Sequence, residues 1–502
     1  MSHDELPNDW GPVLQDLADR RATARSMGGD DKVERHRSKG KLDARQRVER
    51  LLDPGTFTEI GTLVGAVPAD GLVAGHGLIA GRPVMVGAED FTTLGGSIGA
   101  GSANKRYRIS ELAYQERVPL IMLLEGAGHR PPLPGEPHGG RSPVDLSMQV
   151  RLSGRVPVIT GVMGASAGHG ALIAPMSDYC VMTEQGAIFT AGPPVVKESL
   201  GEDIAKEDLG GPEVAVGSGL VHDVFGDDDA VCDAIRTYLS FFPSNAWQYA
   251  PRRENTDMGE RHVDELLSII PKNNRRGYDM HRVIEQVVDE GRYVEVHEGY
   301  GRAIVCALAH VGGDAVAIVA NNPKVLAGSI DSDAADKASH FIQVADSFHL
   351  PIVFLTDNPG VLAGSASERK AILRHGARMF AAQAWCTTVK LQVTLRKAYG
   401  FGSMVMSMTS FSNQTLSYAF PAATLGAMGA AGSSRSVKAD EDTAAAIRQA
   451  ELDASYRSAS TLGFDELVDP RELRNALLHG LRLSAQRRTV APEPVSRVGI
   501  MP

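Results

Sequence analysis

Two glycine-rich turns are the parts of this sequence best suited to chemistry. The first runs from Gly164 to Gly170, between an apolar run typical of a buried strand and a helical pattern. Glycines let a backbone approach a ligand closely, and the first N–H groups of a helix lack partners inside it. Such a turn can hold an oxyanion or enolate, each donor contributing about 3 kcal/mol to a transition state. A plain strand-to-helix connection explains these residues equally well at this stage.

The second turn, Tyr399 to Gly402, occupies the equivalent place in the other half of the chain. It supplies a second set of backbone N–H donors at the start of a helix. Because the turn is present twice, we favour a ligand-binding role over a purely structural one. Two such sites suit an enzyme that binds two different ligands.

A serine hydrolase is the main rival reading of the first turn. Residues Gly164 to Gly168 fit GxSxG, the nucleophile elbow, with Ser166 as nucleophile and His169 or His222 as its base. However, small residues in a glycine-rich chain match this pattern easily. The second turn also has Ala398 where the first has Ser166. We therefore keep a thioester hydrolase as the minor alternative.

Other candidate groups carry weaker signals. His375 follows Arg374 in a probable helix, where it is either a ligand contact or an ordinary helix residue. No HExxH or comparable spacing occurs, so we expect no protein-held metal. A basic run could meet the phosphates of a nucleotide-bearing ligand, although such runs are more often solvated helix faces. The run comprises Arg35, Arg37, Lys39, Lys41, Arg45 and Arg47.

An internal repeat indicates how the two turns are positioned. Gly96-Ser97-Ile98 recurs as Gly328-Ser329-Ile330, and every matching pair lies 232 positions apart. Further pairs with this spacing are Lys105 and Lys337, Gly128 and Gly360, Gly168 and Gly400, and Gly170 and Gly402. A register kept over this length indicates duplication of one α/β unit of strands, glycine-rich turns and helices.

Composition sets the class of protein. The 502 residues carry a net charge of −10, which argues against general binding of nucleic acid. The four cysteines lie far apart and suggest free thiols. The start of the chain is polar, and the most apolar stretch, 156–176, is rich in glycine and contains His169, so we expect no signal peptide and no membrane span. The cytoplasm is the expected location.

Many ordered segments resemble the carboxyltransferase β-subunits of biotin-dependent propionyl-CoA and acetyl-CoA carboxylases. They include KGKLDARQRVERLLDPGTFTEI, EDFTTLGGSIG, GYGRAIVCALAHVGGDAVAIVANNPKVLAGSIDSDAADKASHFIQVAD, TDNPGVLAG and ILRHGARMFAA. The resemblance covers nearly the whole chain. It implies an α/β fold of two tandem crotonase-like domains, each a ββα superhelix, which we place at 1–260 for acyl-CoA and 261–502 for biotin.

The resemblance also implies residue roles. Backbone N–H groups of Gly168 and His169 would hold the thioester enolate, and those of Phe401 and Gly402 the biotin ureido oxygen. In that family the biotin nitrogen removes the α-proton, so no protein base is required. The assigned CoA-binding residues are Arg45, Arg47, Gly126, Gly128 and Ala167. The assigned biotin-binding residues are Gly360, Gly364, Tyr399 and Gly400.

Three departures from the family pattern concern the ligands. The family has two glycines at Gly168-His169 and Gly-Ala at Phe401-Gly402. Its SGGARI loop is replaced by EGAGHR, which starts at Glu125. The position associated with acyl-chain choice is Met404, which is not the residue type expected for either propionyl or acetyl groups. An unusual acyl-CoA, or an inactive subunit that serves only assembly, therefore stays open.

The resemblance predicts partners as well. No Met-Lys-Met biotinylation motif and no ATP-grasp region occurs in the chain. We therefore expect biotin to be carried in trans on a biotin carboxylase or biotin carrier subunit. The expected assembly is a homo-hexamer or a mixed hexamer of β-subunits.

Overall fold

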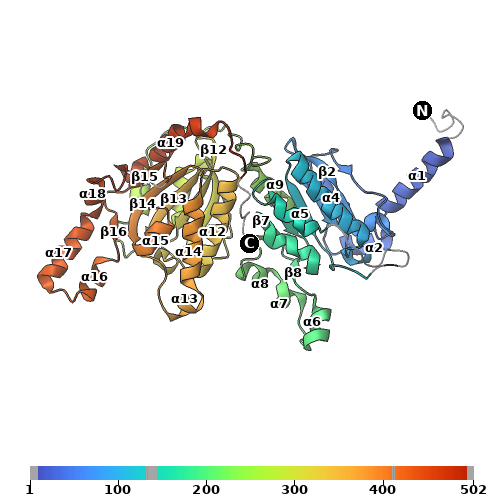
Figure 1. The fold of residues 1–502 in the computed structure, drawn as a ribbon, viewed down its shortest axis with the longest axis horizontal. Helices are drawn as coiled ribbons and strands as arrows, with labels where there is room; N and C mark the ends of the chain where they lie inside the picture. The colour runs from blue at the N-terminus through green and yellow to red at the C-terminus, as the bar shows by residue number, and fades with distance from the viewer. Residues whose placement is uncertain (1–9, 132, 134–143, 410, 412, 495–502) are drawn as a thin grey trace. The chain divides into compact units, whose positions relative to one another are not determined.

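The computed structural model describes residues 10–131, 133, 144–409, 411 and 413–494. Within them the chain forms two compact units, one ending at Leu239 and one beginning at Ser240 (Figure 1). This boundary lies before the expected one at 260–261, because the intervening segment packs with the second unit. There the N–H of Arg253 donates to the carbonyl of Gly313 (2.8 Å), and Val263 is buried in the second core.

The first unit is built on a mainly parallel sheet in the order β1-β2-β3-β4-β5-β7-β9, with a separate pair β6-β8. Its strands are β1 Thr58–Glu59, β2 Leu72–Ile79, β3 Arg82–Glu89, β4 Leu120–Leu124, β5 Val158–Val162, β6 Ala165–Ala167, β7 Tyr179–Thr183, β8 Ala187–Phe189 and β9 Asp223–Phe225. Strands β1, β2 and β3 pair antiparallel, and each later pair is parallel.

The helices of this unit are α1 Trp10–Arg25, α2 Asp30–Arg37, α3 Ala44–Leu51, α4 Ala100–Glu116, α5 Asp145–Leu152, α6 Pro193–Leu200, α7 Lys206–Gly210, α8 Pro212–Gly217 and α9 Asp228–Ser240, with 3-10 segments η2 Pro68–Gly71, η3 Leu94–Gly96 and η4 Gly168–Met176. Helices α3 and α4 pack on β2 and β3, and α5 packs beside α4. Side chains alternate along β4, so Leu120, Met122 and Leu124 face one side, where Ile109 of α4 and Leu152 of α5 pack on them.

The second unit repeats the plan in the order β10-β11-β12-β13-β14-β15-β17, with β16 beside β14. Its strands are β10 Tyr293–Val296, β11 Ile304–Val311, β12 Asp314–Asn321, β13 Ile352–Asn358, β14 Lys390–Tyr399, β15 Leu416–Ala419, β16 Thr424–Gly426 and β17 Glu466–Leu467. Its helices are α10 Leu266–Ile269, α11 Met280–Val287, α12 Ser332–Ser347, α13 Ser365–Arg369, α14 Ile372–Trp385, α15 Gly400–Val405, α16 Ala430–Ser436, α17 Glu441–Leu452, α18 Ala454–Ala459 and α19 Leu473–Leu483, with 3-10 segments η5 Asp289–Gly291, η6 Leu326–Gly328, η7 Pro470–Glu472 and η8 Ala485–Arg488.

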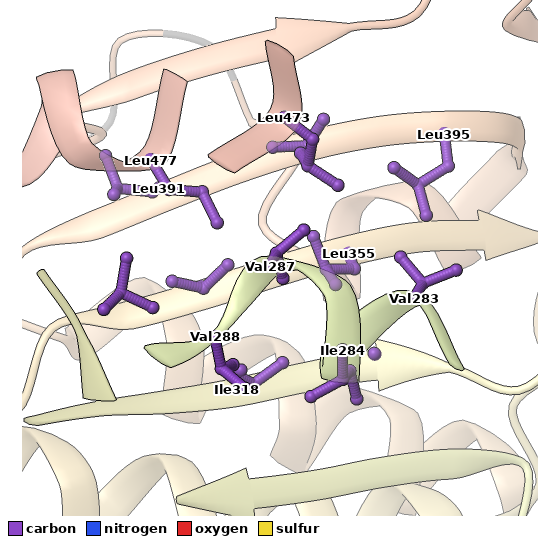
Figure 2. Packing of buried hydrophobic residues seen from close by; sticks show 14 of the residues in the cluster. Val283, Ile284, Val287, Val288, Ile318, Leu355, Leu391, Leu395, Leu473 and Leu477 are labelled. Carbon is purple, nitrogen blue, oxygen red and sulfur yellow. The ribbon is translucent and has the colours of Figure 1, made fainter. Parts of the chain in front are cut away.

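The core of the second unit lies between α11, α19 and one face of the sheet. Figure 2 shows Ile284 and Val287 of α11 against Ile318 of β12 and Leu355 of β13, with Leu473 of α19 nearby. All five are at most 1% exposed. Burial of each such side chain contributes about 1.5–3 kcal/mol to the free energy of folding. Helices α12 and α14 lie side by side over the sheet's other face (Figure 1).

The structure confirms the duplication and extends it. Strands β2 and β11, and β3 and β12, keep the 232-residue offset at both ends. The isolated bridge between Ile98 and His129 has its counterpart at the same offset between Ile330 and Val361. The buried ammonium of Lys105 donates to the carbonyl of Ala69 (3.1 Å), and its counterpart Lys337 to that of His297 (2.8 Å). The repeated lysines therefore anchor each helix to a loop.

The repeat also includes helices α3 and α11, which lie 236 positions apart instead of 232. The segment between this helix and the first long strand is four residues longer in the first unit, so the constant offset did not reveal the match. Asp43 caps α3 and Asp279 caps α11. Two residues after each cap, Arg45 makes two hydrogen bonds to Glu59 (2.9 and 3.1 Å), and His281 bonds to Glu295 (2.7 Å). Equivalent ion pairs thus fix the entry helix of each unit.

Candidate active site

At the first turn, the backbone after β6 passes close to the backbone of the loop after β4. Strand β6 ends at Ala167, whose N–H donates to the carbonyl of Gly126 (2.9 Å) in the loop after β4. Gly128 has a φ of +82°, and a Cβ there would lie 3.0 Å from the carbonyl of Ala167. Gly168 has a φ of +62°, a region that side-chain-bearing residues rarely adopt. The structure therefore brings the predicted Gly126, Gly128, Ala167 and Gly168 together.

This crossing leaves backbone donors at the start of η4. The 3-10 segment begins at Gly168, and no side chain caps it at Ala167. The leading N–H groups of such a segment, among them those of Gly168 and His169, have no partner within it. The arrangement is what an oxyanion-binding turn requires.

The side chain of His169 enters a buried charge network that the sequence did not reveal. Its Nε2 lies 2.5 Å from Oδ1 of Asp145, and Nε of Arg106 donates to the other carboxylate oxygen (2.8 Å). Arg106 also donates to Glu89 (2.8 Å) and to the carbonyl of Gly170 (3.3 Å). The network thereby connects helices α4 and α5 to strand β3 and to the turn.

Ionisation within this network follows from burial and pairing. Burial alone would raise the pKa of Asp145, but the hydrogen bond from His169 and the charge of Arg106 outweigh it and hold that pKa far below its usual value. Burial raises the pKa of Glu89, against the opposing charge of Arg106. The ring of His129 stands edge-on to that of His169, with centroids 4.7 Å apart. Burial lowers the pKa of His129.

Glu125, the first residue of the EGAGHR loop, is the ion-pair partner of two basic residues near the N-terminus, Lys41 and Arg47. Arg47 is 1% exposed and pairs with Glu125 (2.7 Å) and with Asp228 (2.8 Å), and Lys41 also pairs with Glu125 (2.7 Å). Burial alone would raise the pKa of Glu125, but the charges of Arg47 and Lys41 hold it below its usual value. Arg47, for which a CoA-binding role was expected, thus has its guanidinium in ion pairs that support the loop. Arg45 is partly exposed and paired with Glu59.

The second turn has the same construction with different residues. Gly400 has a φ of +56° and Gly360 a φ of +124°. A Cβ on Gly402 would lie 2.4 Å from Oδ1 of Asn358 and 2.6 Å from Cα of Gly360. Asn358 itself is fully buried and accepts a hydrogen bond from the N–H of Gly360 (2.9 Å). Helix α15 begins at Gly400 without a side-chain cap, so its first N–H groups have no intrahelical partner.

A cavity of 480 Å³ lies beside this turn. Tyr399 lines it, and the Tyr399 hydroxyl donates to Glu451 (2.6 Å), whose carboxylate also accepts the N–H of Ala430 (2.8 Å). Burial and the bond to Glu451 raise the pKa of Tyr399. Pro359 and Lys397 also line the cavity, whereas Gly360, Gly364, Gly400, Phe401 and Gly402 do not.

The remaining residues predicted on this side are placed as follows. Phe401 and Met404 lie on α15 with 37% and 49% of their surfaces exposed. The ring of Phe401 packs near that of Phe380, with centroids 5.9 Å apart. Gly364 precedes α13 and has a φ of +131°, and a Cβ there would have no described atom within 4 Å apart from its chain neighbours.

The residues of the hydrolase alternative do not form a triad. Ser166 is fully buried, and its hydroxyl has no hydrogen-bond partner in the part of the chain that the structure describes. Nδ1 of His222 accepts the N–H of Cys180 (3.0 Å), which uses one ring nitrogen structurally. His375 pairs with Asp336 (2.8 Å) between α14 and α12. A nucleophile shielded from solvent cannot attack a thioester, so this alternative is not supported.

Known proteins share this architecture. Residues 35–498 match the carboxyl transferase domain family. The methylmalonyl-CoA carboxyltransferase 12S subunit of Propionibacterium freudenreichii subsp. shermanii is 36% identical, with 95% of each chain covered. The mitochondrial propionyl-CoA carboxylase beta chain of Homo sapiens is 34% identical over 96% of this chain and 92% of its own.

A solved transcarboxylase 12S, described as a hexamer assembly with methylmalonyl-CoA and methylmalonic acid bound, superposes with a TM-score of 0.89 at 34% identity, covering 99% of this chain and 100% of that one. Both units thus follow the crotonase-like carboxyltransferase fold that the sequence predicted. None of the described helices has the length and apolar character needed to cross a bilayer. The chain therefore belongs to the carboxyl transferase domain family.

Proposed function

We propose that this chain is the carboxyltransferase subunit of a biotin-dependent acyl-CoA carboxylase. It transfers a carboxyl group between carboxybiotin and the α-carbon of an acyl-CoA. The observation that carries the proposal is the duplicated turn: each unit presents uncapped backbone N–H groups after a crossing that requires glycines. Family membership supports the same reaction class.

The first unit is assigned to the acyl-CoA. The N–H groups of Gly168 and His169 hold the thioester oxygen as the enolate develops, because donors fixed in advance stabilise charge without reorganisation. Gly126, Gly128 and Ala167 shape the backbone beside the thioester. Arg45, which is partly exposed, is the remaining candidate for the CoA phosphates. Arg47 is left out because it is buried in ion pairs.

The second unit is assigned to biotin, which when bound serves as the carrier of the carboxyl group. The cavity lined by Tyr399 lies next to the turn, and the N–H groups of Phe401 and Gly402 at the start of α15 are the donors for the ureido oxygen. Gly360, Gly364 and Gly400 keep this part of the backbone free of side chains. A neutral, hydrogen-bonding ring suits a site built mainly of backbone donors.

The proposed partners follow from the reaction. A biotin carboxylase or biotin carrier subunit brings biotin in trans, and the chain assembles as a homo-hexamer or a mixed β-subunit hexamer, as the relative's hexamer suggests. The cytoplasm is the proposed location.

The reverse reaction tests the proposal without a partner or ATP. Purified chain is incubated with malonyl-CoA or methylmalonyl-CoA, with and without free biotin, and CoA species are separated by chromatography. We expect acetyl-CoA or propionyl-CoA to form faster when biotin is added. No dependence on biotin for either substrate contradicts the proposal. Free CoA as the main product would instead indicate thioester hydrolysis.

Met404 is proposed to limit the acyl chain. Its side chain projects from α15 and is half exposed, so truncation leaves open space rather than a collapsed core. We expect Met404→Ala to raise kcat/KM for a longer acyl-CoA relative to propionyl-CoA by about tenfold, since one methylene in a pocket is worth 10–200-fold. Leu483→Ala, an exposed position on α19, is the matched control. An unchanged ratio in Met404→Ala contradicts the role.

A further inference from the structure

We infer that the imidazole of His169 is a proton donor, and that it gives this chain a further activity: decarboxylation of a malonyl-type CoA thioester without biotin. The inference rests on the proposed function, because it requires the thioester to bind at the first turn. The observation behind it is that one residue supplies both a backbone N–H at the turn and an imidazole paired with a buried carboxylate.

The hydrogen bonds fix the tautomer of this ring. The carboxylate of Asp145 is an acceptor on both oxygens, receiving Nε of Arg106 on one and Nε2 of His169 on the other. Nε2 therefore carries a hydrogen, and Nδ1 is the atom that gains or loses the second proton. Nδ1 has no hydrogen-bond partner among residues 10–131, 133, 144–409, 411 and 413–494, and the side chain is 24% exposed.

Two groups lie against this ring. The groups that face it are the Asp145 carboxylate from α5 and the His129 ring from the loop after β4. Behind Asp145, Arg106 of α4 pairs with both Asp145 (2.8 Å) and Glu89 of β3 (2.8 Å). Asp145 stays ionised because its pKa is held far down, whereas burial lowers the pKa of His129 and favours its uncharged ring. The ring of His169 is thus paired with one ionised carboxylate.

The proposed step is balanced without a further reactant. The bond between the α-carbon and the carboxylate carbon breaks, and CO2 leaves. Its electron pair forms an enolate, whose oxygen is held by the N–H groups of Gly168 and His169. The proton on Nδ1 of His169 passes to the α-carbon and yields the acyl-CoA. The imidazole then regains a proton from water, so each turnover consumes one proton and releases one CO2.

The experiment compares two activities of the same full-length preparation. Avidin-treated chain is given malonyl-CoA, and CO2 and acetyl-CoA are measured; a second sample receives free biotin and reports biotin-dependent turnover. We expect CO2 release without biotin above the heat-inactivated control. His169→Gln retains the backbone N–H and a donor for Asp145 but cannot carry the proton. It should lower the biotin-free rate at least about 100-fold, the usual contribution of a general acid.

A pH profile separates proton donation from a structural role. In the wild type the biotin-free rate should decrease as pH rises, because the proton donor is lost. The residual rate of His169→Gln should not show this decrease at high pH. Asp145→Asn should lower the rate and shift the pH of this decrease, because the partner charge is lost. The ratio of biotin-free to biotin-dependent turnover should drop in both variants.

Two results overturn the inference, and they differ from failure of the proposed function. Biotin-dependent turnover without any biotin-free CO2 release rejects the decarboxylase and leaves the carboxyltransferase standing. A folded His169→Gln protein with the wild-type biotin-free rate rejects His169 as the donor. Absence of both activities rejects both proposals.

Discussion

Replacing Gly402 with alanine should lower kcat/KM for biotin-dependent carboxyl transfer by at least about 100-fold, the loss typical of one oxyanion donor. The family pattern has alanine at this position, but in this chain Asn358 and Gly360 occupy the space that its Cβ would need. A Cβ at this position would lie 2.4 Å from Oδ1 of Asn358 and 2.6 Å from Cα of Gly360. Real Cβ atoms do not come so close, so the turn must shift. Asn358 cannot give way easily, because it is fully buried and bonded to Gly360 and to Asn321. The shift therefore falls on the N–H groups at the start of α15.

The matched control is Gly259→Ala in the same unit, where a Cβ meets nothing within 4 Å. Thermal unfolding of both variants separates a displaced turn from an unfolded one. Gly402→Ala should stay folded, because the steric conflict is confined to one turn. Transfer at the wild-type rate in folded Gly402→Ala protein would remove the second turn from the mechanism.

The repeat explains why so much of the architecture could be predicted. A gapless offset requires equal lengths of strand, turn and helix in both copies, and the glycines at 128, 168, 360 and 400 recur because each has a positive φ. Side chains cannot easily occupy such backbone, so residue type reports conformation directly. The fold class and the family relationship were confirmed for this reason.

The charge networks could not be predicted, because their members lie far apart in sequence. His169 and Asp145 are 24 residues apart, and Arg47 and Asp228 are 181 apart. Local patterns report periodicity and turn chemistry, whereas these pairs depend on which helix meets which strand end. Arg47 is an example: a charged residue in a basic helix suggested a solvated or phosphate-binding face, yet its side chain is buried and paired with Glu125 and Asp228. The individual site residues stay predictions until they are tested.

The largest loss of stability is expected from Arg47→Met. The substitution keeps much of the buried stem but leaves Glu125 and Asp228 without their shared cation, and Lys41 then compensates only Glu125. Removing one partner from a buried ion pair costs about 3–5 kcal/mol, because the remaining charge is uncompensated. Urea unfolding at neutral pH, followed by circular dichroism, should show this decrease in the free energy of unfolding. Arg50→Met is the control, since its pairs with Asp229 and Asp233 are exposed and worth about 1 kcal/mol or less.

The pH dependence of stability identifies the cause of that loss. A carboxyl group whose folded pKa lies below its unfolded value stabilises the protein at pH values above the unfolded pKa, near 4.5 for Glu125. That stabilisation disappears as pH falls through the folded pKa. Arg47→Met removes the charge that most strongly lowers the pKa of Glu125, so the difference between wild type and variant should shrink as pH drops below about 4.5. A difference that stays constant with pH would mean that lost packing, and not the uncompensated Glu125, accounts for the effect.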